Sequence, residues 1–404
     1  EKSVACLTVK TEDTPKLTLD GKPVPDVEWK PVPDTEYSTA QYDLGKEPRS
    51  HTLEVPDSRF GLLFLLYPES SELPSGEKPS SPAGREFVVP TTQIPKTNEP
   101  VRYELRFTGY TDDTTVTVQC DPLDYKKDFP LAKGQTVTIS ITVPAAVLAS
   151  FKGNPFIVTA TQPVSLVSQL CVGPQVYIIE CVPRQKQGRV YYVVTPARKS
   201  DDDNKVFSIT NFERPNKVTM RPTGVVNFQG ETYKPGSTMT IPLGPFQAVT
   251  FDSKDDLSGT EVSAASPVTV SSGYTSSETA KTPYQATVTL MPTESWGTQY
   301  MFQSINFPGR LDTVHITASK PTQLEYQVGK NKESQTLEPG QTVHLEIPES
   351  TPVSIRAKRG VNVIYHCTGG ERSGQSYQPF MVNIPSTEQY STKYLINGSP
   401  NNEK

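Results

Sequence analysis

The sequence has few of the residues that usually carry catalysis or hold a metal ion. Its 404 residues include only 4 histidines and 5 cysteines. No two histidines lie at the short fixed spacing of a zinc site. No glycine-rich phosphate loop is present, and no local nucleophile lies beside a base. We therefore predict that the protein is not an enzyme and that it holds no metal and no cofactor.

Long apolar runs and basic stripes are also absent. The longest apolar run, residues 60–67 (FGLLFLLY), is much shorter than the ~18 residues that suggest a membrane span. The net charge is −5, with acids and bases interspersed, which disfavours a nucleic-acid partner. The chain begins at Glu1 without methionine, which we interpret as a mature form after removal of a signal peptide, or as a trimmed chain. We predict a secreted, extracellular protein with no membrane span and no nucleic-acid partner.

Proline, by contrast, is abundant. The sequence contains 38 prolines, and only 34% of its residues are apolar. Proline interrupts helices and central strands but suits turns and edge strands. The chain is also too long for one ordinary core, so several small cores separated by polar loops are expected. These features predict an all-β protein with short strands and many turns.

Three sequence markers recur along the chain. The first is a turn followed by an alternating strand, and its glycines, Gly134, Gly236 and Gly340, lie 102 and 104 residues apart. The second is a short strand, a turn at Pro or Gly and an apolar strand, at residues 51–63, 156–167, 261–270 and 353–363. The third opens each unit, as Gly84-Arg85-Glu86-Phe87, Gly188-Arg189-Val190-Tyr191, Gly297-Thr298-Gln299-Tyr300 and Ser391-Thr392-Lys393-Tyr394. Three markers in one order predict a tandem repeat.

Each repeat contains about seven or eight candidate strands separated by turn residues, which is typical of an antiparallel β-sandwich with a jelly-roll-like arrangement. The predicted fold is a tandem array of about four such modules of ~100 residues each. We name them module 1 (1–83, without its first strand), module 2 (84–187), module 3 (188–296) and module 4 (297–390). An extra strand and tail follow at 391–404. This strand either completes module 1, which would close the array, or it opens a further module or pairs with the third module.

A set of segments carries a family resemblance, clearest over residues 84–300. They are 188–196 (GRVYYVVTP), 207–211 (FSITN), 226–233 (VNFQGETY), 257–262 (LSGTEV), 267–273 (PVTVSSG) and 292–297 (PTESWG). These segments resemble the N-terminal domain of the IgG-Fc-binding protein family, which occurs in mucus proteins and in invertebrate secreted proteins. Residues 19–67 are similar to a related secreted module. The resemblance implies secreted β modules, and the family name implies binding to IgG Fc. The mucin-type cysteine-rich modules of the family are missing from this sequence, which argues against covalent gel assembly.

The cysteines allow more than one arrangement. Cys171 and Cys181 bracket a turn, and in a secreted chain we predict a disulfide between them, with two buried free thiols as the alternative. The family often carries paired cysteines in this stretch, although modules 3 and 4 do not keep the pair. Among Cys6, Cys120 and Cys367, one pair and one free thiol is the simplest arrangement. The free thiol is a candidate for a link to another chain.

Two basic clusters are the best candidates for ligand binding. One comprises Arg184, Lys186 and Arg189 between modules 2 and 3, with Arg198 and Lys199 nearby, and the other Arg356, Lys358 and Arg359 at a turn of module 4. Brought together, they would form a glycan-binding site for sulfated glycans. The alternative is an ordinary solvated surface whose charges are balanced.

These observations lead to three functional hypotheses. The first is a secreted binding protein that engages an extracellular protein, such as an immunoglobulin or a cytokine, a mucus or matrix protein, or a sulfated matrix glycan. A specialised form of it is a parasite immunomodulator that is tethered to host matrix and captures a host cytokine or immunoglobulin. The second is a structural component of mucus or extracellular matrix that self-associates. The third, an enzyme, requires a catalytic site assembled from distant loops.

Overall fold

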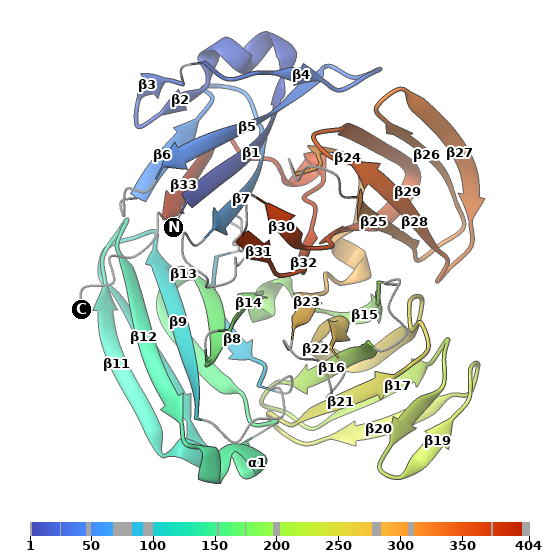
Figure 1. The fold of residues 1–404 in the computed structure, drawn as a ribbon. Helices are drawn as coiled ribbons and strands as arrows, with labels where there is room; N and C mark the ends of the chain where they lie inside the picture. The colour runs from blue at the N-terminus through green and yellow to red at the C-terminus, as the bar shows by residue number, and fades with distance from the viewer. Residues whose placement is uncertain are drawn as a thin grey trace. The chain divides into compact units, whose positions relative to one another are not determined.

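The structure, a computed structural model, describes residues 2–24, 26–45, 50–67, 83–91, 100–151, 153–173, 175–196, 203–276, 284–305, 311–372 and 375–397. Within these ranges the only α-helix is the short α1 (Leu148–Phe151), and the strands pair antiparallel in several sheets (Figure 1). The prediction of an all-β protein with repeated antiparallel modules is confirmed. No helix in the described part of the chain is long and apolar enough to cross a membrane.

The chain forms two compact units. Residues 1–80 and 296–404 make up one, which we call unit A, and residues 81–295 make up the other, unit B. Unit A therefore combines module 1 with module 4, although they lie at opposite ends of the sequence. Unit B contains modules 2 and 3.

Module 2 is built around one long strand, β13, that belongs to two layers. Its first part pairs with β8 and β10, and its second part pairs with β9 and β14. The register shifts between Thr159 and Val164, where Pro163 cannot donate to the ladder. The outer strands β11 and β12 extend the two layers from β10 and β9. The elements are β8 (Gly84–Val89), β9 (Val101–Gly109), β10 (Thr114–Cys120), η2 (Asp121–Leu123), β11 (Tyr125–Leu131), β12 (Thr136–Val143), η3 (Ala145–Val147), α1, β13 (Phe156–Val172), β14 (Gln175–Cys181) and η4 (Arg184–Lys186).

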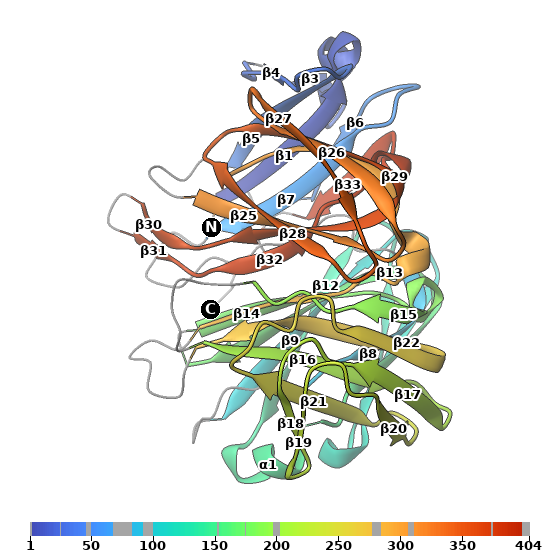
Figure 2. The ribbon, with the colours of Figure 1, turned by 90° about the vertical axis from the view of Figure 1, so that its right-hand side faces the viewer.

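Module 3 repeats this plan and adds a hairpin. The long strand β22 pairs first with β15 and β17 and then with β16 and β23, and Figure 2 shows it beside β16 and β17. The extra hairpin, β18–β19, joins β21 at the pair Asn227–Asp252. The elements are β15 (Gly188–Tyr192), β16 (Asn204–Asn211), β17 (Asn216–Arg221), β18 (Val226–Phe228), β19 (Glu231–Tyr233), β20 (Met239–Leu243), β21 (Ala248–Ser253), β22 (Glu261–Thr275), β23 (Gln285–Thr289) and η5 (Thr293–Ser295).

The hairpin changes the meaning of the first sequence marker. Gly134 and Gly340 precede equivalent strands and donate to Gly109 O and Ala318 O, at 2.9 and 2.8 Å. Gly236 instead donates to Pro222 O, and the strand after it, β20, pairs with β17 in the other layer. The predicted equivalence of the three turns is therefore wrong for module 3. All three glycines do adopt the positive φ that such turns require.

Module 4 has the same two layers around β29. This strand pairs first with β24 and β26 and then with β25 and β32. β27 and β28 are the outer strands. The elements are β24 (Gly297–Gln303), β25 (Leu311–Ala318), β26 (Thr322–Val328), β27 (Asn331–Leu337), β28 (Thr342–Pro348), β29 (Pro352–Cys367), β30 (Gly370–Arg372), β31 (Gln375–Tyr377), β32 (Phe380–Asn383) and η6 (Thr387–Gln389).

Module 1 takes its opening strand from the other end of the sequence. One of its sheets has the order β4-β5-β1-β7 and the other β3-β2-β6-β33. β33 pairs with β6 as β8, β15 and β24 pair with the long strands of their modules, and Figure 1 shows it beside β6. Of the two alternatives for the last strand, it closes onto module 1. The elements are β1 (Lys2–Lys10), η1 (Thr11–Lys16), β2 (Thr18–Leu19), β3 (Lys22–Pro23), β4 (Lys30–Pro31), β5 (Tyr37–Gly45), β6 (Ser50–Glu54), β7 (Gly61–Tyr67) and β33 (Lys393–Asn397).

In modules 1, 3 and 4 a tyrosine of the opening strand forms hydrogen bonds to the segment that follows the turn of the second marker. Its hydroxyl accepts from the amide three residues earlier and donates to a carbonyl across the layer. The amides are those of Gly188, Gly297 and Ser391, at 2.9, 3.0 and 3.1 Å, and the carbonyls are those of Val268, Val361 and Phe60, at 2.7, 2.6 and 2.8 Å. Module 2 has Phe87 in this place, which packs in the core and has no hydroxyl.

Candidate functional site

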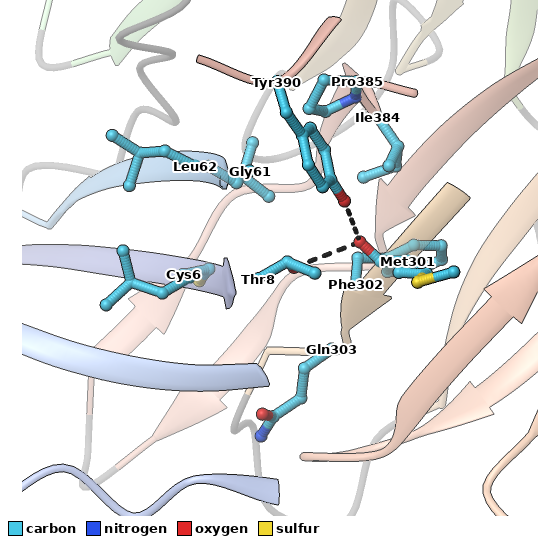
Figure 3. A pocket seen from close by; sticks show the side chains of 12 residues that line it. Cys6, Thr8, Gly61, Leu62, Met301, Phe302, Gln303, Ile384, Pro385 and Tyr390 are labelled. Carbon is cyan, nitrogen blue, oxygen red and sulfur yellow. Dashed lines mark hydrogen bonds between the residues drawn. The ribbon is translucent and has the colours of Figure 1, made fainter. Parts of the chain in front are cut away.

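A small cavity lies within unit A where module 1 meets module 4 (Figure 3). Its volume is about 20 Å³, which is room for about one water molecule and far less than a ligand pocket. Thr8 Oγ1 and Tyr390 Oη both donate to Met301 O at 3.1 Å across it. The remaining lining is mainly apolar and includes Cys6 and Phe302. The cavity is a packing gap between modules and not a substrate site.

Three of the four histidines meet on one sheet of module 4, which sequence spacing did not reveal. Nδ1 of His315 lies 2.6 Å from Nδ1 of His344, and Thr313 Oγ1 lies within 3.1 Å of both His315 Nε2 and His366 Nδ1. His315 and His366 are buried, whereas His344 is exposed. The histidines meet because β25 pairs with both β28 and β29, which places His315 opposite His344 and Thr313 opposite His366. Within the described ranges, no group of three or more His, Cys, Asp or Glu side chains is arranged to hold a metal ion.

A second buried polar group in module 4 surrounds Asp312. Its carboxylate accepts from the hydroxyl of Tyr365 and from Thr368 N, the latter at 3.0 Å. Burial raises the pKa of the Asp312 carboxyl. Tyr365 Oη also accepts from Ile305 N at 3.1 Å. Because these bonds join the start of β25 to the end of β29, the group serves the fold.

The predicted disulfide between Cys171 and Cys181 is wrong for this structure. Both are buried free thiols, because the register pairs Cys171 with Val176 and Cys181 with Leu166. The two cysteines therefore lie five pairs apart along the β13–β14 hairpin, beyond the reach of a disulfide.

Cys6, Cys120 and Cys367 are also buried and free, so the predicted pair among them is absent. Burial raises the pKa of the Cys6 thiol to about 12 and that of Cys120 to about 11. Such thiols are poor nucleophiles at neutral pH. None of the three is therefore a ready link to another chain.

The basic cluster of unit B is only partly available to a ligand. Arg184 donates to Glu86 at 2.9 Å and to Glu213 at 2.6 Å, and its guanidinium lies over the ring of Phe212. The side chain of Arg184 is therefore engaged in ion pairs within unit B, with Glu86 on β8 and with Glu213. Lys186 and Arg189 are exposed. Arg198 and Lys199 lie outside the described residues.

The basic cluster of unit A is more exposed. Arg356, Lys358 and Arg359 lie on β29 at the bend between its two parts, and all three side chains are exposed. Arg356 donates to Asp34 O at 3.1 Å and faces Glu325 across the β26–β29 ladder. The two basic clusters belong to different units.

Large apolar side chains are rarely exposed in the part of the chain that the structure describes. Among the described residues Leu311, at 47% exposed, is the only exposed large hydrophobic. The outer strands β11 and β27 carry charged residues, including Lys126, Lys127 and Lys332, as edge strands do when they are protected against pairing with other chains. The described part of the surface therefore offers a partner mainly polar loops and strand edges.

Comparison with known proteins agrees with the resemblance seen in the sequence. A model of the IgGFc-binding protein family matches residues 181–404, which include modules 3 and 4 and the closing strand. The chain belongs to this family. It is 29% identical over 275 residues to the human IgGFc-binding protein, a match that covers 68% of this chain and 5% of the human protein. The chain thus corresponds to a small part of the length of that relative.

Proposed function

We propose that this chain is a secreted, non-enzymatic binding protein whose β modules engage an extracellular protein, with an immunoglobulin as the first candidate. The observation that carries the proposal is the family match over residues 181–404, together with the name of the human relative. The packing gap between modules 1 and 4 and the buried thiols offer no alternative chemistry. The polar, loop-rich surface favours recognition through hydrogen bonds and charges.

Within the matched range, the β18–β19 hairpin is the surface to test first. It distinguishes module 3 from modules 2 and 4, and the side chains of Glu231 and Thr232 are exposed on it. Repeated scaffolds place specificity in the segments that differ between copies. Val226 of the hairpin is buried, whereas Glu231 and Thr232 are exposed on β19, so these two residues can be changed without unfolding the module.

The test measures binding of the full chain to purified IgG Fc, with the Fab of the same antibody as the negative control. We expect saturable binding to Fc that weakens with salt, because salt screens contacts made by exposed charges such as Glu231. The variant E231A/T232A should weaken it, and K126A/D128A on β11 of module 2 should not. If no Fc, and no purified protein recovered from serum or mucosal extract, binds saturably at low salt, the proposal is wrong.

A second candidate ligand is a sulfated glycan at Arg356, Lys358 and Arg359. The exposure of all three side chains supports it, and the chain offers a matched control in three exposed lysines of module 2, Lys126, Lys127 and Lys133. We expect R356A/K358A/R359A to leave a heparin column at lower salt than the parent protein and than K126A/K127A/K133A. Equal retention of the parent and both variants would exclude this site.

A further inference from the structure

Unit A is assembled from two pieces of chain that are distant in sequence. Residues 1–80 contribute module 1, and residues 296–404 contribute module 4 and the closing strand. The two pieces share a core in which Cys6 and Leu63 pack with residues of module 4. They also share polar contacts, such as Gln41 Nε2 donating to Ser304 O at 2.9 Å.

The closing strand β33 fills the edge position beside β6 in module 1, which we call the slot. Ile396 is fully buried and Tyr394 nearly so, and both belong to the core of module 1. Val55 N donates to Thr392 O at 3.0 Å, and Phe60 N donates to Ser391 O at 2.8 Å. Lys393 forms an ion pair with Glu54, 339 residues away in the sequence.

None of these contacts depends on the two pieces belonging to one chain. The residues of β33 would meet the same partners on β6 of another copy, with the same register and the same buried side chains. Exchange of an identical element between protomers is a low-cost route to assembly, because only the connection changes. The balance between the closed and the exchanged form is then set by concentration.

We propose that module 1 of one copy accepts residues 296–404 of a second copy, closing strand included, so that the protein forms head-to-tail dimers or longer assemblies by exchange. The partner is a second copy of this chain, and the surface is the slot beside β6 with the adjoining face of module 1. The proposal does not depend on binding to an immunoglobulin.

The test uses two full-length variants that can be joined only between chains. Thr52 and Leu395 are direct partners in the β6–β33 ladder, and opposed residues in such a ladder lie roughly 4.5–5.5 Å apart at Cα, within reach of a disulfide. One copy carries T52C and the other L395C. The native cysteines in the described structure are buried. The copies are mixed, unfolded, refolded together and oxidised, and a covalent heterodimer is expected whose yield rises with protein concentration.

Two controls decide the outcome. The double variant T52C/L395C should close within one chain at low concentration and remain a monomer. A mixture of L395C with T138C, an exposed position on β12, should give no such concentration-dependent product. If the double variant closes while mixed T52C and L395C stay monomeric at every concentration, the exchange is disproved. If the double variant fails to close, the slot itself is wrong. Fc binding is measured separately on the closed double variant, so failure of one proposal leaves the other intact.

Discussion

At the residue scale, the hydroxyl of the opening tyrosine shows what a short sequence marker encodes. Tyr191 Oη lies between Gly188 N, Val268 O and Gln187 Oε1, all within 2.9 Å. The spacing Gly-x-x-Tyr was visible in the sequence, but its reason was not, because the carbonyl partner comes from a strand 77 residues away. Module 2 keeps the ring, as Phe87, without the hydroxyl.

Replacing Tyr191 with Phe should therefore destabilise unit B. The change leaves Gly188 N and Val268 O buried without this partner, which costs about 1–3 kcal/mol. Tyr233, whose hydroxyl bonds to Glu231 at an exposed site, provides the matched control, and Y233F should change stability very little. Urea unfolding of the full chain measures both. Equal effects of the two variants would show that the opening hydroxyl is dispensable.

The histidine group of module 4 predicts a dependence of stability on pH. Burial, and then the neighbouring His344 and His366, hold the pKa of His315 well below its ordinary value. The unfolded chain takes up this proton near pH 6.5 while the folded chain does not. Stability from this group is thus complete above pH ~6.5 and is lost as the pH falls below it, by up to about 1.4 kcal/mol per pH unit.

Urea unfolding at pH 7.5 and at pH 5.5 should therefore show a lower midpoint at the acidic pH. The groups that face His315 are His344 from β28, His366 from β29 and Thr313 from its own strand. The variant H315Q removes the titrating group and should flatten the difference between the two pH values. A slope that persists unchanged in H315Q would assign the pH dependence to other residues.

At the scale of secondary-structure elements, β33 is a segment near the end of the sequence that contributes Tyr394 and Ile396 to the core of module 1. Ile396→Ala empties a fully buried position, and such a change typically costs about 2–5 kcal/mol. Lys393→Ala in the same strand removes only an exposed ion pair with Glu54, worth about 0–1 kcal/mol. We expect I396A to lower the unfolding midpoint of unit A clearly and to raise amide exchange in β6. Similar midpoints for I396A and K393A would contradict closure of module 1 by this strand.

Elements also show where sequence reading succeeds and where it fails. The second marker corresponds to the long strands β13, β22 and β29 in modules 2 to 4 and to β6 and β7 in module 1, and the third corresponds to the opening strands, because alternation and turn residues are local features. The first marker was misaligned in module 3, since the inserted β18–β19 hairpin shifts which strand follows the glycine turn. The pairing of His315 with His344 and the distance between Cys171 and Cys181 depend on register, which short-range patterns do not specify.

At the scale of the whole molecule, module 1 differs from the other modules in one respect: its opening strand comes last in the sequence instead of first. In modules 2 and 3, 11 residues join the opening strand to the next one, at 90–100 and 193–203. In module 1 the opening strand β33 comes from the far end of the sequence. A circular permutant that joins Asn397 to Lys2 through such a linker, with new ends between Ser80 and Ser81, would give module 1 the same order as the others.

This permutant should fold with unchanged β content and an unfolding midpoint at or above that of the parent, because closing a short loop costs less entropy than closing a long one. Circular dichroism and urea unfolding measure both properties. Its closing strand can no longer leave with module 4 alone, so strand exchange between copies should also fall when T52C and L395C are placed in the permuted background. An unfolded or aggregated permutant would show that β33 does not serve as the opening strand of module 1.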